Sequence, residues 1–382
     1  MKERLTESFE KRQVRANPDR WKHFGHKALS AVTIGSSIIT PINILSIENI
    51  NENIEAVENG RIDVSVILEA IDQSNNDKAV VFINGFNTND ADKMSRDLGP
   101  GYQQYIQDAQ VLSLSYGNAP LSTQGIAEEI VQMTIDMNIN EVSLMGYSGG
   151  GNIAHDVNRL IRRMSDVEIP YTLNISTANG LDGLRDATKE QIEFYSEVIS
   201  HFPMLVYYDP ARIIGELMIR QSHFTNDDGG YDPEKFFKVL GDINDDINDP
   251  DYAKTSLAYD QLQAIENIDI QEAINESAEQ GQYGLQTVYG YIGTGKGGYD
   301  YVVNDKKSGK EICGYAEEAG VHCVIQNTPN AVHTMPQLTI EEYNQTFKQM
   351  GEVLQSLAAQ ERRVFEQRNH PITQSDLPIA IQ

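Results

Sequence analysis

Short apolar runs alternate along this chain with longer segments in which apolar residues recur at helical spacing. The runs are rich in β-branched residues and are flanked by polar ones, which is typical of strands buried on both faces of a parallel sheet. This pattern predicts strands at 79–83, 110–115, 141–147, 171–177, 286–292 and 321–326. It predicts helices at about 90–98, 122–138, 151–165 and 338–363. Repeated strand–helix units imply an α/β fold with a doubly wound, mainly parallel sheet.

One long segment does not fit this alternation. Residues 183–281 separate what we count as strands six and seven of the complete sheet. The segment opens with helical spacing and continues with an apolar stretch and an acidic loop at 242–251. We therefore expect a helical cap inserted between strands six and seven. Its Tyr207 and Tyr208 either line a pocket for substrate or anchor the cap to the core.

The two ends of the chain differ from its middle. Residues 1–27 carry eight basic and four acidic side chains, which sets them off as a basic N-terminal segment. Residues 28–45 are uncharged and form either a pair of early strands or a poor export signal. The polar residues 366–382 predict a tail that frays. Between these ends we expect one α/β domain at 28–365 that includes the cap at 183–281.

The chain is strongly acidic. Its 56 Asp and Glu residues, against 30 Lys and Arg residues, give a formal net charge of −26. Such a surface repels phosphate backbones, so we expect no nucleic acid partner. No uninterrupted apolar run reaches the roughly 18 residues of a membrane helix, so we predict no transmembrane span. We expect a soluble protein, and both its oligomeric state and its compartment, cytoplasmic or exported, stay open.

Metal-binding patterns are weak in this sequence. The acidic loop at 242–251 spaces Asp and Asn like a calcium loop, but Ile247 stands where glycine is needed and Ala253 where glutamate is needed. This excludes an EF-hand and leaves only an incidental calcium site open. The only cysteines, Cys313 and Cys323, are too few for structural zinc and could face each other across a short hairpin, either bonded or as thiols. We expect no metal and no cofactor.

The apolar run at 141–147 leads into a turn with the sequence Gly146-Tyr147-Ser148-Gly149-Gly150. A strand, G-x-S-x-G and a helix in this order form the nucleophile elbow of serine hydrolases. The chain reverses so sharply that side chains two positions before and after the serine would collide, which explains both glycines. The amide of Gly149 would point at a reacting carbonyl. Because the motif also occurs by chance, the surrounding sequence decides its meaning.

A second motif precedes the elbow. The apolar run at 79–83 ends in Asn84-Gly85-Phe86, followed by a helical stretch. In this position Gly85 would let the backbone approach a ligand closely, and the N–H of Phe86 is the candidate for a second oxyanion donor. An Asn-Gly turn would also end a strand without any such role. The order of the two motifs favours the functional interpretation.

A histidine follows the last expected strand. The run at 321–326 leads into a loop that carries His333. A catalytic base comes last in the chain order Ser, Asp, His, on a loop after the final strand, and His333 meets this condition. His322 lies within the strand and His155 on the helix after the elbow, so we expect structural roles for both.

An acid is needed to orient the imidazole, and two aspartates compete for this role. Asp300 lies on a Gly-rich loop after the strand at 286–292. Asp182 follows the strand at 171–177, where some lipases place their acid. We favour Asp300, with Asp182 as the alternative and Asp305 as a distant third. An aspartate beside glycine most often caps its own turn, so the choice stays open.

At this point the chain resembles the α/β-hydrolase superfamily, especially its lipases and esterases. The resemblance rests on FINGFN, GYSGGGN, the DYVV loop and AVHT, and it covers about residues 78–364. It implies Ser148 as nucleophile, His333 as base and an aspartate as the orienting acid. Two departures stand out: many members have His-Gly where this chain has Asn-Gly-Phe, and the stretch from the strand at 286–292 to Asp300 is longer than usual.

The resemblance implies a serine hydrolase that cleaves small-molecule or lipid esters of carboxylic acids. Ser148 and His333 would act with Asp300, the oxyanion would bind to Phe86 and Gly149, and Tyr147, Tyr207 and Tyr208 would contact substrate. The alternatives are a non-catalytic binding or scaffold protein on the same fold, or an amidase or thioesterase that uses the same residues.

Overall fold

The computed structural model describes residues 46–201, 203–220, 224, 232–249, 251–281, 284–295, 300, 302–328, 330–331, 333 and 339–369. The chain divides into two units, Met1–Asn49 and Ile50–Gln382, and the second contains the sheet. Our expectations for the basic segment 1–27 and for residues 28–45 fall outside the described residues. The same holds for residues 370–382 of the expected tail.

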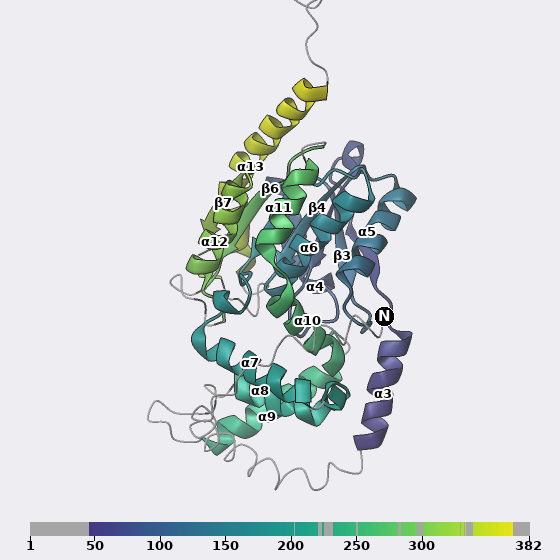
Figure 1. Cartoon of the computed structure of the whole chain (residues 1–382), viewed down its shortest axis with the longest axis vertical. Helices are drawn as coiled ribbons and strands as arrows, with labels where there is room; N and C mark the ends of the chain where they lie inside the picture. The colour runs from purple at the N-terminus through teal and green to yellow at the C-terminus, as the bar shows by residue number, and fades with distance from the viewer. Residues whose placement is uncertain are drawn as a thin grey trace, which may run out of the picture. The chain divides into compact units, whose positions relative to one another are not determined.

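Among the described residues, the sheet has seven strands in the order β1-β3-β2-β4-β5-β6-β7 (Figure 1). They are β1 (Asp63–Leu68), β2 (Lys78–Ile83), β3 (Gln110–Ser115), β4 (Glu141–Tyr147), β5 (Tyr171–Ile175), β6 (Val288–Gly293) and β7 (Cys323–Asn327). β1 is antiparallel to β3, and the other neighbours are parallel. The sheet confirms the predicted fold class and all six predicted strands. β1 was missed because it is a partly exposed edge strand without a continuous apolar run.

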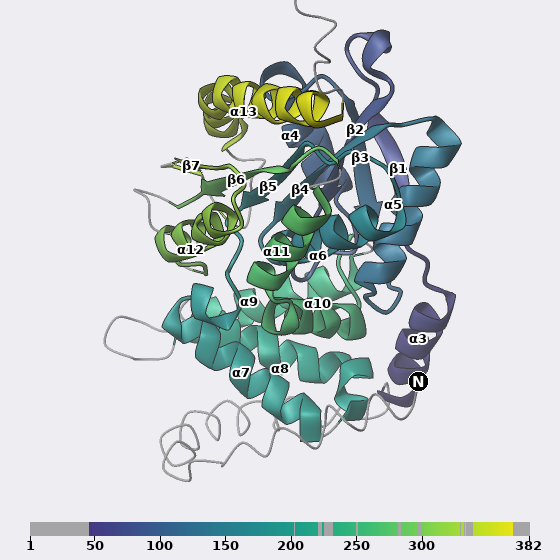
Figure 2. The same cartoon turned by 45° about the horizontal axis from the view of Figure 1, so that its top comes forward.

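Helices cover both faces of this sheet (Figure 2). One face carries α4 (Asp92–Tyr105) and α13 (Ile340–Asn369), and the other carries α5 (Thr123–Met137), α6 (Gly149–Met164), α11 (Ile270–Gln280) and α12 (Asp305–Glu318). Successive residues of a strand point to opposite faces. Val81 and Leu144 therefore pack in one core cluster, and Val80 and Met145 in the other. Burial on both faces explains why the central strands have no polar alternation.

The segment between β5 and β6 is helical. It contains η3 (Leu181–Gly183), α7 (Asp186–His201), η4 (Pro203–Tyr207), α8 (Asp209–Ile219), α9 (Pro233–Asn248), α10 (Thr255–Asn267) and α11. Helices α7 to α10 gather beyond one end of the sheet in both views (Figures 1 and 2). α11 differs from them, because it packs with α12 and β6 in the layer that covers the sheet.

The acidic stretch that we expected as a loop is helical as far as Asn248, so that expectation is wrong. Four residues of α9 recur at intervals of three or four positions and are all buried: Phe236, Val239, Ile243 and Ile247. This stripe faces the protein. Asp242, Asn244 and Asp245 are exposed on the outer face, whereas Asp246 is half-buried and forms an ion pair with Arg220. The alternation that resembled a calcium loop is therefore the polar face of an amphipathic helix.

Helix α13 also differs from the prediction. It ends at Asn369, so the first residues of the expected tail, from 366, are helical. The helix has 30 residues and carries charged groups along most of its length. None of the described helices has an apolar stretch long enough to cross a bilayer.

The segment that precedes β7 forms α12, where the sequence leaves a short hairpin open as a possibility. Two glycines, Gly309 and Gly314, weaken its helical signal. Two contacts compensate for the low helix propensity of these glycines. The side chain of Asn304 caps the helix by accepting a hydrogen bond from the N–H of Lys307. A Cβ at Gly309 would lie 2.7 Å from Cδ1 of Tyr291, so glycine lets the helix pack tightly on β6.

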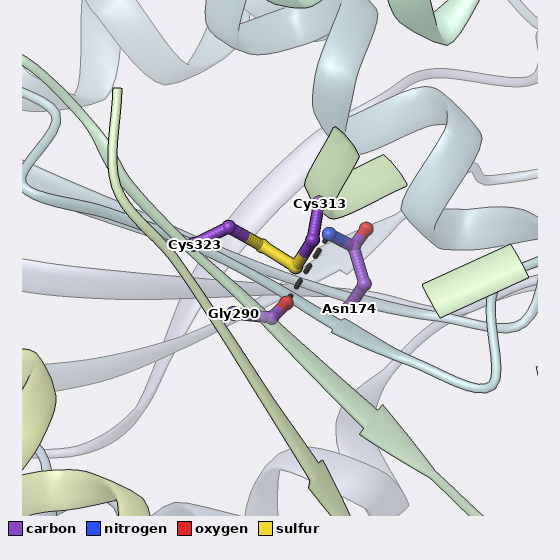
Figure 3. Close-up of a disulfide and its surroundings, with 4 residues drawn as sticks. All are labelled: Asn174, Gly290, Cys313 and Cys323. Carbon is purple, nitrogen blue, oxygen red and sulfur yellow. Dashed lines mark hydrogen bonds between the residues drawn. A yellow bond between two sulfur atoms is a disulfide. The ribbon is translucent and has the colours of Figure 1, made fainter. Parts of the chain in front are cut away.

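A disulfide joins α12 to β7 (Figure 3). Cys313 of the helix is bonded to Cys323, the first residue of the strand, with 5.2 Å between their Cα atoms. Close by, Asn174 of β5 donates an amide hydrogen to the carbonyl of Gly290 on β6 at 3.3 Å. Of the two alternatives the cysteines are bonded, but across a helix and a strand and not across a hairpin, and the bond links β7 to the helix that covers it.

We predict that Cys323→Ser lowers the free energy of unfolding by about 2–3 kcal/mol, because the bond closes a short loop in the unfolded chain. Thermal unfolding of Cys323→Ser, Cys313→Ser and the double variant measures this effect. The three should lose the same stability, since each removes the same bond. Three variants as stable as the wild type would contradict a stabilising disulfide.

Candidate active site

The elbow is a strained turn between β4 and α6. Ser148 follows the strand directly and has φ 52° and ψ −128°, in a region that residues other than glycine rarely adopt. The flanking glycines are required by contact. A Cβ at Gly146 would lie 2.4 Å from Cα of Gly151, and a Cβ at Gly150 would lie 2.2 Å from the carbonyl oxygen of Ile83. The turn therefore places Ser148 at the carboxyl end of β4, at the centre of the sheet.

Three side chains that are far apart in the sequence meet at this turn. Nε2 of His333 lies 3.0 Å from Oγ of Ser148. Nδ1 of the same ring lies 2.7 Å from Oδ2 of Asp300. The Asp300 side chain is fully buried and that of His333 is 11% exposed. The structure thus brings together the three residues that we favoured as nucleophile, base and acid.

The carboxylate of Asp300 is held by its own loop. Its Oδ1 accepts hydrogen bonds from the N–H groups of Val302 and Val303, at 2.7 and 2.9 Å. Its Oδ2 accepts a third from the hydroxyl of Thr294, at 2.9 Å, beside the bond to His333. These donors fix the carboxylate and compensate for its burial. The orientation of the imidazole is fixed in turn.

The two charged groups shift each other's proton affinity. Burial acts to raise the pKa of Asp300, but the bonds and charge of His333 and the two backbone N–H groups outweigh it and lower this pKa to about 2. Burial acts to lower the pKa of His333, and the negative charge of Asp300 outweighs it, so that the pKa lies above its ordinary value. Asp300 therefore stays ionised, and His333 accepts a proton more readily than free imidazole.

The other two acids that the sequence offered are placed differently. Asp182 lies on η3 with its side chain 72% exposed, and it forms an ion pair with Lys189. The structure does not bring it to His333. Asp305 is buried at the start of α12 and is bonded to Tyr291 and to the N–H of Thr294. Neither takes the position of Asp300 on the imidazole.

The loop after β2 lies against the elbow. A Cβ at Gly85 would lie 2.6 Å from the carbonyl oxygen of Tyr147 and 2.7 Å from the nitrogen of Gly149. A Cβ at Gly149 would lie 3.6 Å from the nitrogen of Phe86. The backbone nitrogens of Phe86 and Gly149 are therefore neighbours beside Ser148. The side-chain-free Gly85 permits this close approach.

Two residues from the helical segment hold this loop in place. Gln261 of α10 accepts a hydrogen bond from the N–H of Asn87 and donates one to the carbonyl of Thr88, both at 2.8 Å. Arg212 of α8 donates to the side chain of Asn87 and to the carbonyl of Ala253. Sequence reasoning missed both. A lone arginine within the apolar stretch of α8 was an available signal, whereas nothing in the local sequence marks Gln261.

The tyrosines expected at the substrate have other described contacts. Tyr147 is buried and donates its hydroxyl hydrogen to the backbone carbonyl of His333. Its ring centroid lies 5.7 Å from that of the imidazole. It therefore supports the His333 loop. Tyr207 and Tyr208 are half-buried, and the carbonyl of Tyr207 accepts a hydrogen bond from Asn53. Substrate contact by these three residues stays a prediction.

No family profile and no curated protein matches this sequence. Solved structures do. A thermostable carboxyl esterase from Bacillus coagulans aligns with a TM-score of 0.52 and 10% identity over 79% of this chain and 96% of its own. An esterase from Exiguobacterium antarcticum aligns with a TM-score of 0.48 and 12% identity over 78% of this chain and 97% of its own. At this identity the first likeness establishes the fold alone, which is the α/β-hydrolase fold.

We predict that Asp300→Asn moves the pKa of His333 from above to below its ordinary value of 6.5. The variant removes the charge that favours the imidazolium most, and burial, which disfavours it, then outweighs the smaller effect of Asp305. NMR titration of the His333 ring protons measures the change. Asp182→Asn is the matched control, and it should leave this titration where it is in the wild type. If the pKa of His333 moved in Asp182→Asn and stayed unchanged in Asp300→Asn, Asp182 and not Asp300 would be the acid that acts on His333.

Proposed function

We propose that the protein is a serine hydrolase that cleaves carboxylic esters through an acyl-enzyme intermediate. The observation that carries this proposal is the continuous chain of hydrogen bonds from Ser148 through His333 to Asp300. A serine hydroxyl that faces an imidazole, itself oriented by a buried carboxylate, is an activated nucleophile. The fold shared with the carboxyl esterase from Bacillus coagulans agrees with this chemistry.

Acylation follows from the geometry. Oγ of Ser148 attacks the ester carbonyl while Nε2 of His333, 3.0 Å away, removes its proton. The resulting imidazolium is stabilised by Asp300. The negative oxygen of the tetrahedral intermediate would accept hydrogen bonds from the N–H groups of Phe86 and Gly149. His333 then gives its proton to the leaving alcohol, and the acyl group remains on Ser148.

Deacylation repeats these steps with water. His333 removes a proton from a water molecule, which attacks the acyl carbonyl, and the same two amides hold the oxyanion. Breakdown of the second intermediate returns the proton to Ser148 and releases the acid. The proposed cycle uses groups of this chain and water, so it requires no cofactor.

We propose that α7 to α10 form the cap over this site and that an apolar acyl group binds beneath it. A Cβ at Gly149 would lie 2.9 Å from Cδ1 of Ile265, so α10 reaches the elbow. Ile265 belongs to an apolar cluster with Leu262, Ile192 and Leu184, and Phe86 packs against it. Apolar side chains beside the nucleophile favour a hydrocarbon group on the acyl side of the ester.

We predict that Ser148→Ala lowers kcat for a short p-nitrophenyl ester by at least about a thousandfold, because the variant has no nucleophile. Hydrolysis is followed by the absorbance of p-nitrophenol, and circular dichroism checks the fold. Ser200→Ala, at an exposed serine near the end of α7, serves as the matched control and should keep full activity. A Ser148→Ala variant that hydrolyses the ester at the wild-type rate would eliminate the proposed mechanism.

The same assay separates the alternatives. A scaffold protein would hydrolyse neither esters nor thioesters. An amidase or thioesterase would use Ser148 but prefer a different leaving group, so a panel of ester, thioester and anilide substrates with one common acyl chain ranks the three activities.

We predict that Gln261→Leu lowers kcat by about tenfold to a hundredfold with little change in KM. The variant removes both bonds from Gln261 to the loop of Phe86 and leaves that of Arg212. Misplaced oxyanion donors weaken binding of the transition state more than that of the substrate. Steady-state kinetics measures the change, and thermal unfolding accounts for any loss of stability.

Gln263→Leu is the matched control for this prediction. Gln263 lies on the same helix but bonds to Ser196 and Glu266, away from the loop. It should keep wild-type kcat. Equal losses in the two variants would mean that α10 acts through general packing rather than through Gln261.

A further inference from the structure

A second buried carboxylate lies behind Asp300. Asp305 is 7% exposed, and its side chain is surrounded by β6 and by the end of β5. Its Oδ2 accepts hydrogen bonds from the N–H of Thr294 at 3.0 Å and from the hydroxyl of Ser176 at 3.3 Å. Its Oδ1 lies 2.7 Å from the hydroxyl of Tyr291. The proposed reaction does not yet use this acid.

Thr294 connects the two carboxylates. Its backbone N–H is bonded to Asp305, and its hydroxyl is bonded to Asp300. The hydroxyl of Ser176 is in turn bonded to that of Thr294. Ser176 has φ 46°, an uncommon backbone conformation for a residue with a side chain. Such strain persists only where the surrounding structure enforces it, and it is common at functional sites.

The hydrogens around Asp305 allow two states. Tyr291 has one phenolic hydrogen but two acceptors within reach, the carbonyl of Thr177 at 2.9 Å and Asp305 at 2.7 Å. When Asp305 is ionised, the two acceptors compete for this hydrogen. When Asp305 is protonated, its own hydrogen is donated to the tyrosine oxygen, and the tyrosine donates to Thr177. The same heavy-atom positions therefore accommodate both charge states.

Charges around Asp305 act on it from several elements. Burial and the negative charge of Asp300 raise its pKa to about 6, against the opposing effects of Tyr291, the N–H of Thr294 and the charge of His333. Asp305 acts on His333 in turn: its negative charge raises the pKa of His333, although by less than the charge of Asp300 does. Burial, and in addition the negative charges of Asp300 and Asp305, also raise the pKa of the nearby Tyr147 and Tyr343.

We propose that Asp305 is a positioning residue for the triad: through Thr294 it holds the carboxylate of Asp300, and in its ionised form it adds a second negative charge behind His333. This inference rests on the proposed function. The additional charge stabilises the imidazolium that forms when His333 removes the proton of Ser148. Protonation of Asp305 in acid removes this charge, so that His333 becomes a weaker base.

Asp305→Asn tests this proposal because it imitates the protonated acid. An asparagine accepts from the N–H of Thr294 and donates to Tyr291, so the fold is retained. The acid limb of kcat/KM should shift to lower pH by about one unit, and kcat at pH 8 should fall by up to about tenfold. A loss of activity that is equal at every pH, with an unmoved limb, would show a merely structural role and overturn the proposal.

Two further variants keep the test decisive. Tyr291→Phe removes a donor that favours the ionised Asp305, so the limb should shift in the same direction by a smaller amount. Asp182→Asn removes an exposed carboxylate and should leave the limb unmoved. A shift in Asp182→Asn as large as that in Asp305→Asn would mean that the net charge of the protein, and not Asp305, sets the limb.

An NMR titration of His333 separates this proposal from the proposed reaction. The titration compares Ser148→Ala with the double variant that carries both Ser148→Ala and Asp305→Asn. Neither protein has to hydrolyse an ester for His333 to titrate. A lower midpoint for His333 in Asp305→Asn supports the coupling even if the protein cleaves no ester. Equal midpoints overturn it even if the protein is an esterase.

Discussion

The site depends on one buried carboxylate. Asp300 has no solvent contact, yet it stays ionised because two backbone N–H groups, one hydroxyl and one imidazole donate to it. A buried charge without these donors would be neutralised. The loop after β6 supplies the two backbone groups, so the conformation of that loop determines where the carboxylate lies. The position of His333, and with it the proposed reactivity of Ser148, follows from this arrangement.

A second constraint acts on the opposite side of Ser148. The loop that carries Phe86 approaches the elbow closely. Gln261 bonds to the backbone of this loop, and Arg212 donates to the side chain of Asn87 within it. Both side chains come from the helices between β5 and β6. Helices α8 and α10, which lie beyond one end of the sheet, therefore hold one of the two proposed oxyanion donors in position. A change in the packing of these helices would affect the proposed reaction through this loop.

Much of the fold was predictable, since the parallel strands are buried on both faces and their apolar runs are continuous. The elbow was also predictable, because Gly146 and Gly150 are required by contacts with backbone. Helix α12 was missed because its glycines hide the helical pattern, and tertiary contact with Tyr291 replaces the missing propensity. α9 was read as a loop because its acidic face resembled a ligand pattern.

The site was predictable as far as local motifs reach. Ser148 and His333 stand in recognisable surroundings, but the choice between Asp300 and Asp182 depended on which loop turns toward the imidazole, and the sequence does not specify that direction. Gln261 bonds to backbone atoms of the loop after β2, Arg212 to the side chain of Asn87 and the carbonyl of Ala253, and Thr294 to the carboxylates of Asp300 and Asp305. These roles follow from the folded arrangement. The place of Arg212 in an apolar stretch was a signal in the sequence, but nothing in the local sequence marks Gln261 or Thr294.

The most direct test of the central claim is the covalent labelling of the protein with a fluorophosphonate, followed by peptide mass spectrometry. An activated serine displaces fluoride and keeps the phosphonyl group. The account predicts one equivalent of label, on the peptide that contains Ser148, with a rate that falls sharply in Asp300→Asn. A protein that stays unlabelled, or that carries the label on another residue, would contradict it.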